Sequence, residues 1–124
     1  MLDGAHAVCR LPAGGEVPAW ANEGEGLRAV VRTPEELSIV CDERAVPAGV
    51  EASGGWRALR VVGTLDLSLT GVLIELLAPL EEAQIPIFAI STFDTDYVLV
   101  PGERVDDART ALVSAGSRFT DPAG

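Results

Sequence analysis

Apolar and polar residues follow two different periods along this chain. From Ser68 to Ala83, apolar residues recur every three or four positions, which predicts an amphipathic helix with Ser68 as its N-cap. Pro79 lies inside this run and should bend the helix or loosen its last turns. A second helix is predicted from Glu103 to Ala115, with Gly116 ending it.

Short runs rich in apolar and β-branched residues, bounded by glycine, proline or polar residues, predict strands. Turns at residues 33–36 and 93–95 should join four of these strands into two hairpins. A helical turn is expected at residues 18–22, a connector at 47–55 and a short edge strand at 117–120. The predicted strands are Ala5 to Leu11, Leu27 to Arg32, Leu37 to Cys41, Trp56 to Gly63, Ile85 to Thr92 and Asp96 to Val100.

The order of strand, linker and hairpin occurs twice in the chain. When the sequence is shifted by 59 positions, residues 30–33 fall on residues 89–92, and residues 37–41 fall on residues 96–100. Chance similarity between two hairpins is the alternative, but the repeated order favours a duplication. We therefore expect an α+β fold with two units, residues 1–55 and 56–124, each with helices on one face of an antiparallel sheet.

The first unit should have degraded helices, because no strong helical period precedes residue 56. Such a unit leaves part of its sheet uncovered. The uncovered face predicts that the two halves pack together or that the protein forms a homodimer.

The charge balance excludes some classes of partner. The chain has 124 residues and a net charge of -10, and all nine of its basic residues are arginine. An acidic surface without a local basic patch does not favour nucleic acid. No apolar run reaches the ~20 residues of a membrane span, and no signal peptide is present, so we expect a cytoplasmic protein.

The sequence has few residues and no motifs that are typical of metal, cofactor or redox chemistry. Cys9 and Cys41 are far apart in sequence and are interpreted as buried thiols acting as small hydrophobic residues. His6 is the only histidine, and with two distant cysteines it could bind zinc only if a carboxylate took part, so we expect no metal site. No cofactor motif occurs, and we expect no cofactor.

Two segments could together form a ligand site. The first lies between a predicted strand and the long helix, where backbone N–H groups at the positive end of a helix suit a carboxylate. The second is the tip of the second hairpin, whose carboxylates and hydroxyls could hold an ammonium group, and whose Phe93 could contact an apolar part of the ligand. The candidate residues are Asp66, Ser68, Leu69, Thr70, Gly71, Ser91, Thr92, Phe93, Asp94 and Asp96.

Structural roles are the alternative for each of these residues. Ser68 and Thr70 could be helix caps, and Gly71 a packing glycine. Asp94 and Asp96 could be turn formers with solvated carboxylates, and Phe93 could belong to the core. Only the convergence of the two segments favours a ligand.

These segments carry a resemblance to a known family. The runs Leu67 to Leu73, Ala78 to Leu80 and Ile85 to Val100 resemble the ACT-domain family, in particular bacterial CASTOR-like proteins, and are similar to the animal cytosolic arginine sensors called CASTOR. The segment Thr33 to Val40 resembles the first ACT unit of the bacterial members. The resemblance covers most of the chain from Leu27 to Ala115.

The resemblance implies tandem ACT units of the ferredoxin-like βαββαβ kind, amino-acid binding and no catalysis. It implies that Thr92, Phe93 and Asp96 contact the ligand. Leu69 stands where the arginine sensors have an acidic residue, so a smaller or more apolar amino acid than arginine is expected.

The residues and the resemblance together predict a regulatory module that binds an amino acid and controls a partner protein. The first alternative is an ACT-fold module for dimerisation or partner docking that has lost its ligand. The second is a small enzyme with Asp66 and Asp96 as paired carboxylates, which would need one raised pKa in a closed pocket. The lack of a catalytic motif makes an enzyme the weaker hypothesis.

Overall fold

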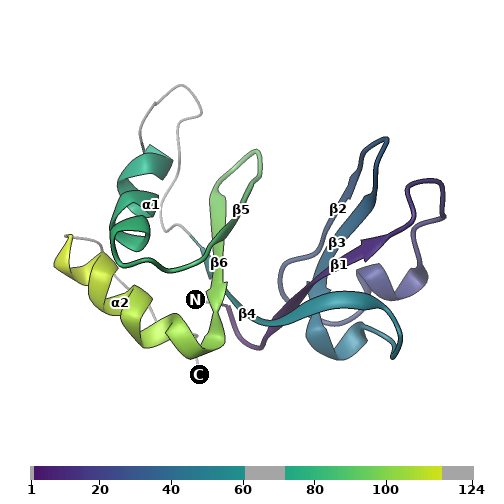
Figure 1. Ribbon diagram of the computed structural model, residues 1–124, viewed down its shortest axis with the longest axis horizontal. Helices are drawn as coiled ribbons and strands as arrows, with labels where there is room; N and C mark the ends of the chain where they lie inside the picture. The colour runs from purple at the N-terminus through teal and green to yellow at the C-terminus, as the bar shows by residue number, and fades with distance from the viewer. Residues whose placement is uncertain (1, 61–71, 116–124) are drawn as a thin grey trace. The chain divides into compact units, whose positions relative to one another are not determined.

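The chain divides into two compact units in the computed structural model, which describes residues 2–60 and 72–115, the side chains of 72–76 excepted (Figure 1). The N-terminal unit comprises residues 3–56, and the C-terminal unit comprises residues 57–124 together with residues 1–2. Strand β4 (Glu51–Arg60) continues from one unit into the other. None of the described helices is long and apolar enough to span a membrane.

The N-terminal unit is a sheet covered on one face by irregular chain. Its strands are β1 (His6–Leu11), β2 (Ala29–Arg32), β3 (Leu37–Asp42) and the first half of β4, in the order β2-β3-β1-β4. Two short 3-10 helices, η1 (Ala19–Asn22) and η2 (Glu43–Ala45), complete it. Residues 3–56, all of which are described, contain no α-helix, in agreement with the degraded helices expected from the sequence.

Alternate residues of β1 and β3 form the core of this unit. Because side chains alternate across a strand, residues 7, 9 and 11 share one face with residues 37, 39 and 41 of the paired strand. Ala21 of η1 covers this face. Cys9 and Cys41 are both free and buried there, as predicted, and burial raises the pKa of the Cys41 thiol to about 12.

The predicted boundary of β4 is wrong. We expected a connector at residues 47–55 and a strand from Trp56, but β4 begins at Glu51 and pairs with β1 along residues 51–53. The pairing shifts register before Trp56, and Gly55 there has a φ of +78°. The Glu43 carboxylate accepts a hydrogen bond from the Gly55 N–H, which stabilises this irregular segment. The irregularity interrupts the alternation that would have identified the strand.

Asp42 fixes the turn that follows β3. Its buried carboxylate accepts hydrogen bonds from the backbone N–H groups of Arg44, at 3.0 Å, and of Glu25, at 3.2 Å. The Arg44 guanidinium binds the same carboxylate at 2.7 Å. These bonds, that of the guanidinium first, hold the pKa of Asp42 far below its usual range.

A buried histidine fixes the segment before β2 in the same way. The Leu27 N–H donates to Nε2 of His6 at 3.0 Å, and the neighbouring Gly26 has a φ of +84°. A Cβ at Gly26 would lie 2.5 Å from that nitrogen.

Gly26→Ala should therefore lower the free energy of unfolding by about 2–3 kcal/mol, because backbone strain and a clash with a fully buried ring add together. Gly49→Ala is the matched control, since Gly49 has a φ of +90° but nothing within 4 Å of the added Cβ. Urea unfolding of both variants would measure the difference. Equal losses would show that the clash with His6 contributes nothing.

The C-terminal unit places two helices on one face of a small sheet. The second half of β4, β6 (Asp96–Pro101) and β5 (Phe88–Ser91) lie in that order, and β5 pairs antiparallel with β6. Helices α1 (Val72–Glu82) and α2 (Val105–Ser114) pack against the sheet, and η3 (Gly102–Arg104) leads into α2. The core contains Leu59, Leu80, Ile85, Val98, Val100, Val105, Ala108 and Leu112.

The end of α1 has a helix-terminating motif in which glutamine replaces the usual glycine. Gln84 has a φ of 58°, and the N–H groups of Gln84 and Ile85 bond back to the carbonyls of Glu81 and Leu80. The Arg104 guanidinium donates to the carbonyls of Ala83 and Gln84, which places a positive charge at the negative end of the helix. The predicted helix thus ends within a residue of its expected position.

The internal similarity seen in the sequence extends to hydrogen-bond register. Ala29 pairs with Val40 and Arg32 with Leu37, while Phe88 pairs with Leu99 and Ser91 with Asp96, each 59 positions later. The 3-10 helices η2 and η3 follow their hairpins at the same offset. Residues 29–45 and 88–104 therefore share the same strand register and the same order of elements, a hairpin followed by a 3-10 helix.

Candidate functional site

The predicted ligand site falls partly on described residues. Ser91, Thr92, Phe93, Asp94 and Asp96 lie on the β5–β6 hairpin. The other five candidates, Asp66, Ser68, Leu69, Thr70 and Gly71, lie outside the described residues, so the geometry below concerns the hairpin and the start of α1.

The hairpin tip is held by Thr92. Its backbone N–H and its hydroxyl both donate to the Thr95 carbonyl, at 2.8 and 2.9 Å, and its Oγ1 accepts from the Thr95 N–H at 3.2 Å. Thr33 makes the corresponding bonds with Glu36 in the first hairpin. Thr92 is thus a turn-forming residue, and its hydroxyl is already engaged within the hairpin.

Ser91 and Asp96 lie directly opposite each other where the two strands end. Because Thr92 and Thr95 form the hydrogen-bonded pair that closes the turn, Ser91 and Asp96 form the next, non-hydrogen-bonded pair, in which side chains lie closest. Ser91 is exposed and Asp96 is half-buried. The pair therefore presents a hydroxyl and a carboxylate side by side.

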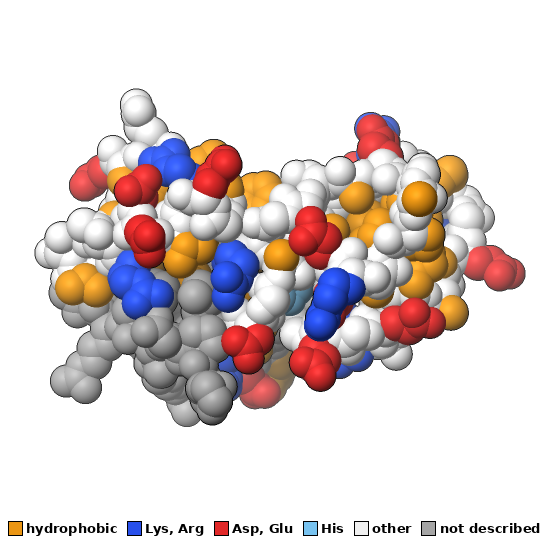
Figure 2. Space-filling model, turned by 90° about the horizontal axis from the view of Figure 1, so that it is seen from below, with side chains coloured by type: hydrophobic (Ala, Val, Ile, Leu, Met, Phe, Trp, Pro, Cys, Tyr) orange, Lys and Arg blue, Asp and Glu red, His pale blue; other side chains and the backbone are white. Residues whose placement is uncertain are grey.

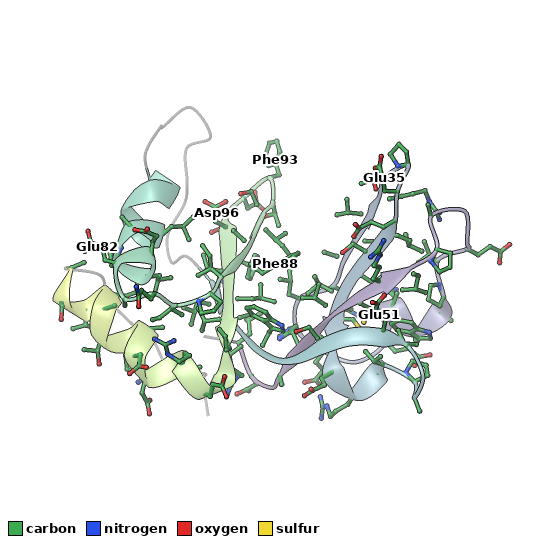
Figure 3. The ribbon with its side chains drawn as sticks, in the orientation of Figure 1. Glu35, Glu51, Glu82, Phe88, Phe93 and Asp96 are labelled. Atoms are coloured by element: carbon green, nitrogen blue, oxygen red, sulfur yellow. The ribbon has the colours of Figure 1, made fainter. Side chains whose placement is uncertain are left out.

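This pair lies on the face of the sheet that the helices cover. Val98 and Val100 belong to the core beneath the helices, and side chains alternate along β6, so Asp96 shares their face. Figure 3 shows Asp96 on the side of β6 nearest α1. In Figure 1, α1 begins at the same end of the unit as the hairpin tip.

A carboxylate and a helix N-terminus at one end of a domain have complementary chemistry. The N-terminus of α1 carries a partial positive charge and suits an anion, whereas Asp96 suits a cation. An α-amino acid carries both charges on neighbouring atoms.

Phe93 and Asp94 occupy the tip itself and are exposed. Phe93 is 83% exposed and points away from the body of the unit (Figure 3). The proposed contact between Phe93 and an apolar ligand group stays a prediction.

An open hollow of about 680 Å³ between α1 and α2 was missed by the sequence analysis. It has one charged side chain, Glu82, and it lies at the ends of the helices rather than beside the Ser91–Asp96 pair. Its remaining lining is small or apolar, which offers a ligand little to orient it. The lining residues are Ala78, Pro79, Glu82, Ala83, Ala111, Ser114 and Ala115.

Charged side chains of the described residues are spread over the surface. Residues 2–60 and 77–115 contain no cluster of His, Cys, Asp and Glu side chains that could hold a metal ion. On the face seen in Figure 2, arginine side chains are scattered among carboxylates and form no continuous basic area.

Family comparison identifies the class of protein. Two helices on one face of an antiparallel hairpin sheet define a ferredoxin-like α+β domain in the C-terminal unit. The family model of the ACT domain matches residues 51–114, just over half of the chain, and a model of an N-terminal domain matches residues 4–49. The chain belongs to the ACT-domain family, which confirms the resemblance found in the sequence.

Individual relatives agree with this assignment. The human protein CASTOR3P is 29% identical over 85 residues, which cover 58% of this chain and 52% of that protein. The chain thus spans about half the length of this curated relative.

Solved structures share the fold over nearly the whole chain. A protein from Agrobacterium tumefaciens superposes with a TM-score of 0.88 at 32% identity and covers 99% of this chain and 93% of its own. The regulatory subunit of aspartate kinase from Thermus thermophilus gives a TM-score of 0.67 at 15% identity, covering 94% of this chain and 95% of its own.

Proposed function

We propose that this protein is a regulatory module without catalytic activity that binds an amino acid and controls a partner protein, in the cytoplasm. The observation that carries the proposal is the Ser91–Asp96 pair, which lies on the helix-covered face at the end of the unit where α1 begins. Asp96 would hold the α-ammonium group. The backbone at the start of α1, with residues 66–71 before it, would hold the α-carboxylate.

The family supports the regulatory part of this proposal. CASTOR3P is similar to the chain, and an aspartate kinase regulatory subunit shares its fold. The two free, buried cysteines support a reducing compartment such as the cytoplasm.

We further propose that the N-terminal unit is a second ACT-like unit that has lost its helices, with the division near residues 55 and 56. The shared register and the shared 3-10 helix after each hairpin support a common origin. Leu37 takes the place of Asp96 in this unit and is fully buried, so one amino-acid site per chain is expected.

A thermal-shift screen against the twenty amino acids tests the function. An amino acid at about 100 times its dissociation constant adds about 2.7 kcal/mol to the free energy of unfolding, which raises the midpoint by several degrees. A shift with an apolar amino acid and none with arginine is expected, because Leu69 is not acidic. If no amino acid raises the midpoint, the result would contradict the sensor function and favour the docking module. The exposed Phe93 is the feature that supports such a module.

A further inference from the structure

Residues 24–27 of the N-terminal unit cross a pair of buried titratable side chains. His6 of β1 and Asp42 of β3 are register partners, and they are 1% and 5% exposed. A Cβ at Gly24 would lie 2.6 Å from the Cβ of Asp42, and one at Gly26 would lie 2.5 Å from Nε2 of His6. This segment, the strap, therefore passes directly over both side chains, although its own residues are exposed or half-buried.

Two amides of the strap bond to side chains whose accepting atoms can bind a proton. The Leu27 N–H donates to Nε2 of His6 at 3.0 Å, and the Glu25 N–H donates to Oδ2 of Asp42 at 3.2 Å. A protonated imidazole has a hydrogen on both ring nitrogens, so it cannot accept the first bond. The two glycines of the strap have φ values of +79° and +84° and would regain conformational freedom on release.

We propose that the strap is a pH-sensitive latch that opens when His6 is protonated, so that a proton acts on this protein as a second signal beside an amino acid. A solvated imidazole has a pKa of about 6.5, which places the response between about pH 7 and about pH 5. The closed strap needs an unprotonated Nε2 and binds a proton less readily than the open strap. The open population therefore rises as the pH falls.

The charged groups around His6 are balanced in sign. Asp42 would favour an imidazolium beside it, but its carboxylate is already bound by the Arg44 guanidinium at 2.7 Å, whose positive charge opposes a second one. The same ion pair keeps Asp42 ionised at pH 5, so its bond to the Glu25 amide persists and release begins at Leu27. Among the described residues, the elements packed against His6 carry two further carboxylates and two further guanidiniums, those of Glu25, Glu43, Arg28 and Arg57.

The core of the N-terminal unit should stay intact while the strap opens. That core lies on the other face of β1 and β3, because its residues alternate with His6 and Asp42 along the two strands. Its buried members have no carboxylate or imidazole, and burial raises the pKa of the thiols of Cys9 and Cys41. Opening therefore uncovers His6 and frees the chain that enters β2 without unfolding the sheet.

The test is amide hydrogen exchange of the full chain, followed by NMR at several pH values and expressed as protection factors, which correct for the intrinsic effect of pH. The protection factor of Leu27 should fall about thirtyfold between about pH 7.5 and about pH 5, as expected for a group with a pKa of about 6.5 that is protonated only in the open strap. The protection factor of Ile39, in the middle of β3, should not change.

His6→Gln is the matched variant, because its amide oxygen can accept the Leu27 bond but does not titrate between these pH values. Its Leu27 protection factor should not depend on pH. The ring of His6, the only histidine of the chain, gives a readout that needs no variant. Its nitrogen chemical shifts report protonation, which should follow the loss of protection at Leu27.

Four results would overturn the latch. The first is a Leu27 protection factor that stays constant with pH, and the second is one that falls as steeply in His6→Gln as in the unaltered protein. The third is a parallel loss of protection at Ile39, which would mean that the whole unit unfolds. The fourth is a protonated His6 ring in a protein whose Leu27 amide is still protected.

Discussion

Asp42→Ala should lower the free energy of unfolding of the N-terminal unit by about 2–4 kcal/mol. The change leaves the N–H groups of Arg44 and Glu25 without their acceptor in a partly buried site. Tryptophan fluorescence during urea unfolding measures this loss selectively, because Trp20 and Trp56, the two tryptophans of the chain, both belong to residues 3–56.

Lowering the pH should remove the stabilisation by the Asp42 carboxylate from the unaltered protein. The bonds from Arg44, followed by that from Glu25, hold the pKa of Asp42 below its ordinary value of 3.8, so the unfolded chain binds a proton more readily than the folded one. The stabilisation is therefore fully present above that value and is lost as the pH falls below it.

In Asp42→Asn, the free energy of unfolding should accordingly fall less with decreasing pH than it does in the unaltered protein. Glu35→Gln is the matched control, because it removes one carboxylate from the exposed tip of the β2–β3 hairpin (Figure 3). The measurement is the free energy of unfolding at several pH values below neutrality. If the two variants lose stability with the same slope in acid, Asp42 does not have the depressed pKa inferred here.

Local sequence was enough to predict the hairpins and the helices. Both turns begin with a threonine whose hydroxyl bonds to the backbone three residues later, a contact that depends on four consecutive residues. The two helices follow from apolar spacing within about three turns of chain. The opposition of Ser91 and Asp96 follows from the same hairpin register.

Contacts between distant segments were not predictable. The start of β4 depends on pairing with β1, more than 40 positions earlier in the chain. Asp42 binds an amide 17 positions away and His6 binds one 21 positions away, and neither spacing is a local pattern. Residues that order the N-terminal unit therefore looked like ordinary surface positions in the sequence.

The proposed site also depends on both local sequence and contacts between distant segments. The hairpin register could be read from the alternation of apolar residues and from the turn, whereas the face on which Asp96 lies depends on the core that Val98 and Val100 form with the helices. A carboxylate on the opposite face would be on the side of the sheet away from α1. The face, rather than the turn, is what makes Asp96 a candidate ligand-binding residue.

Asp96→Ala should weaken binding of the amino acid that gives the largest thermal shift by about thirtyfold or more. A charge-assisted hydrogen bond to an ammonium group contributes about 2 kcal/mol or more when its partner is partly buried, and Asp96 is half-buried. Isothermal titration calorimetry would measure the change. Asp96→Asn should also lose most of the affinity, because it keeps the shape of the side chain but not its charge.

Two controls separate this role from a general effect of charge or folding. Glu81→Ala removes an exposed carboxylate from the end of α1 in the same unit and should leave the affinity unchanged. Thermal unfolding of Asp96→Ala without added amino acid should match that of the unaltered protein, since the carboxylate forms no ion pair with another described residue. An unchanged affinity in Asp96→Ala would remove Asp96 from the site. An equal loss in Glu81→Ala would mean that the net charge of the unit, rather than a contact at the hairpin, attracts the amino acid.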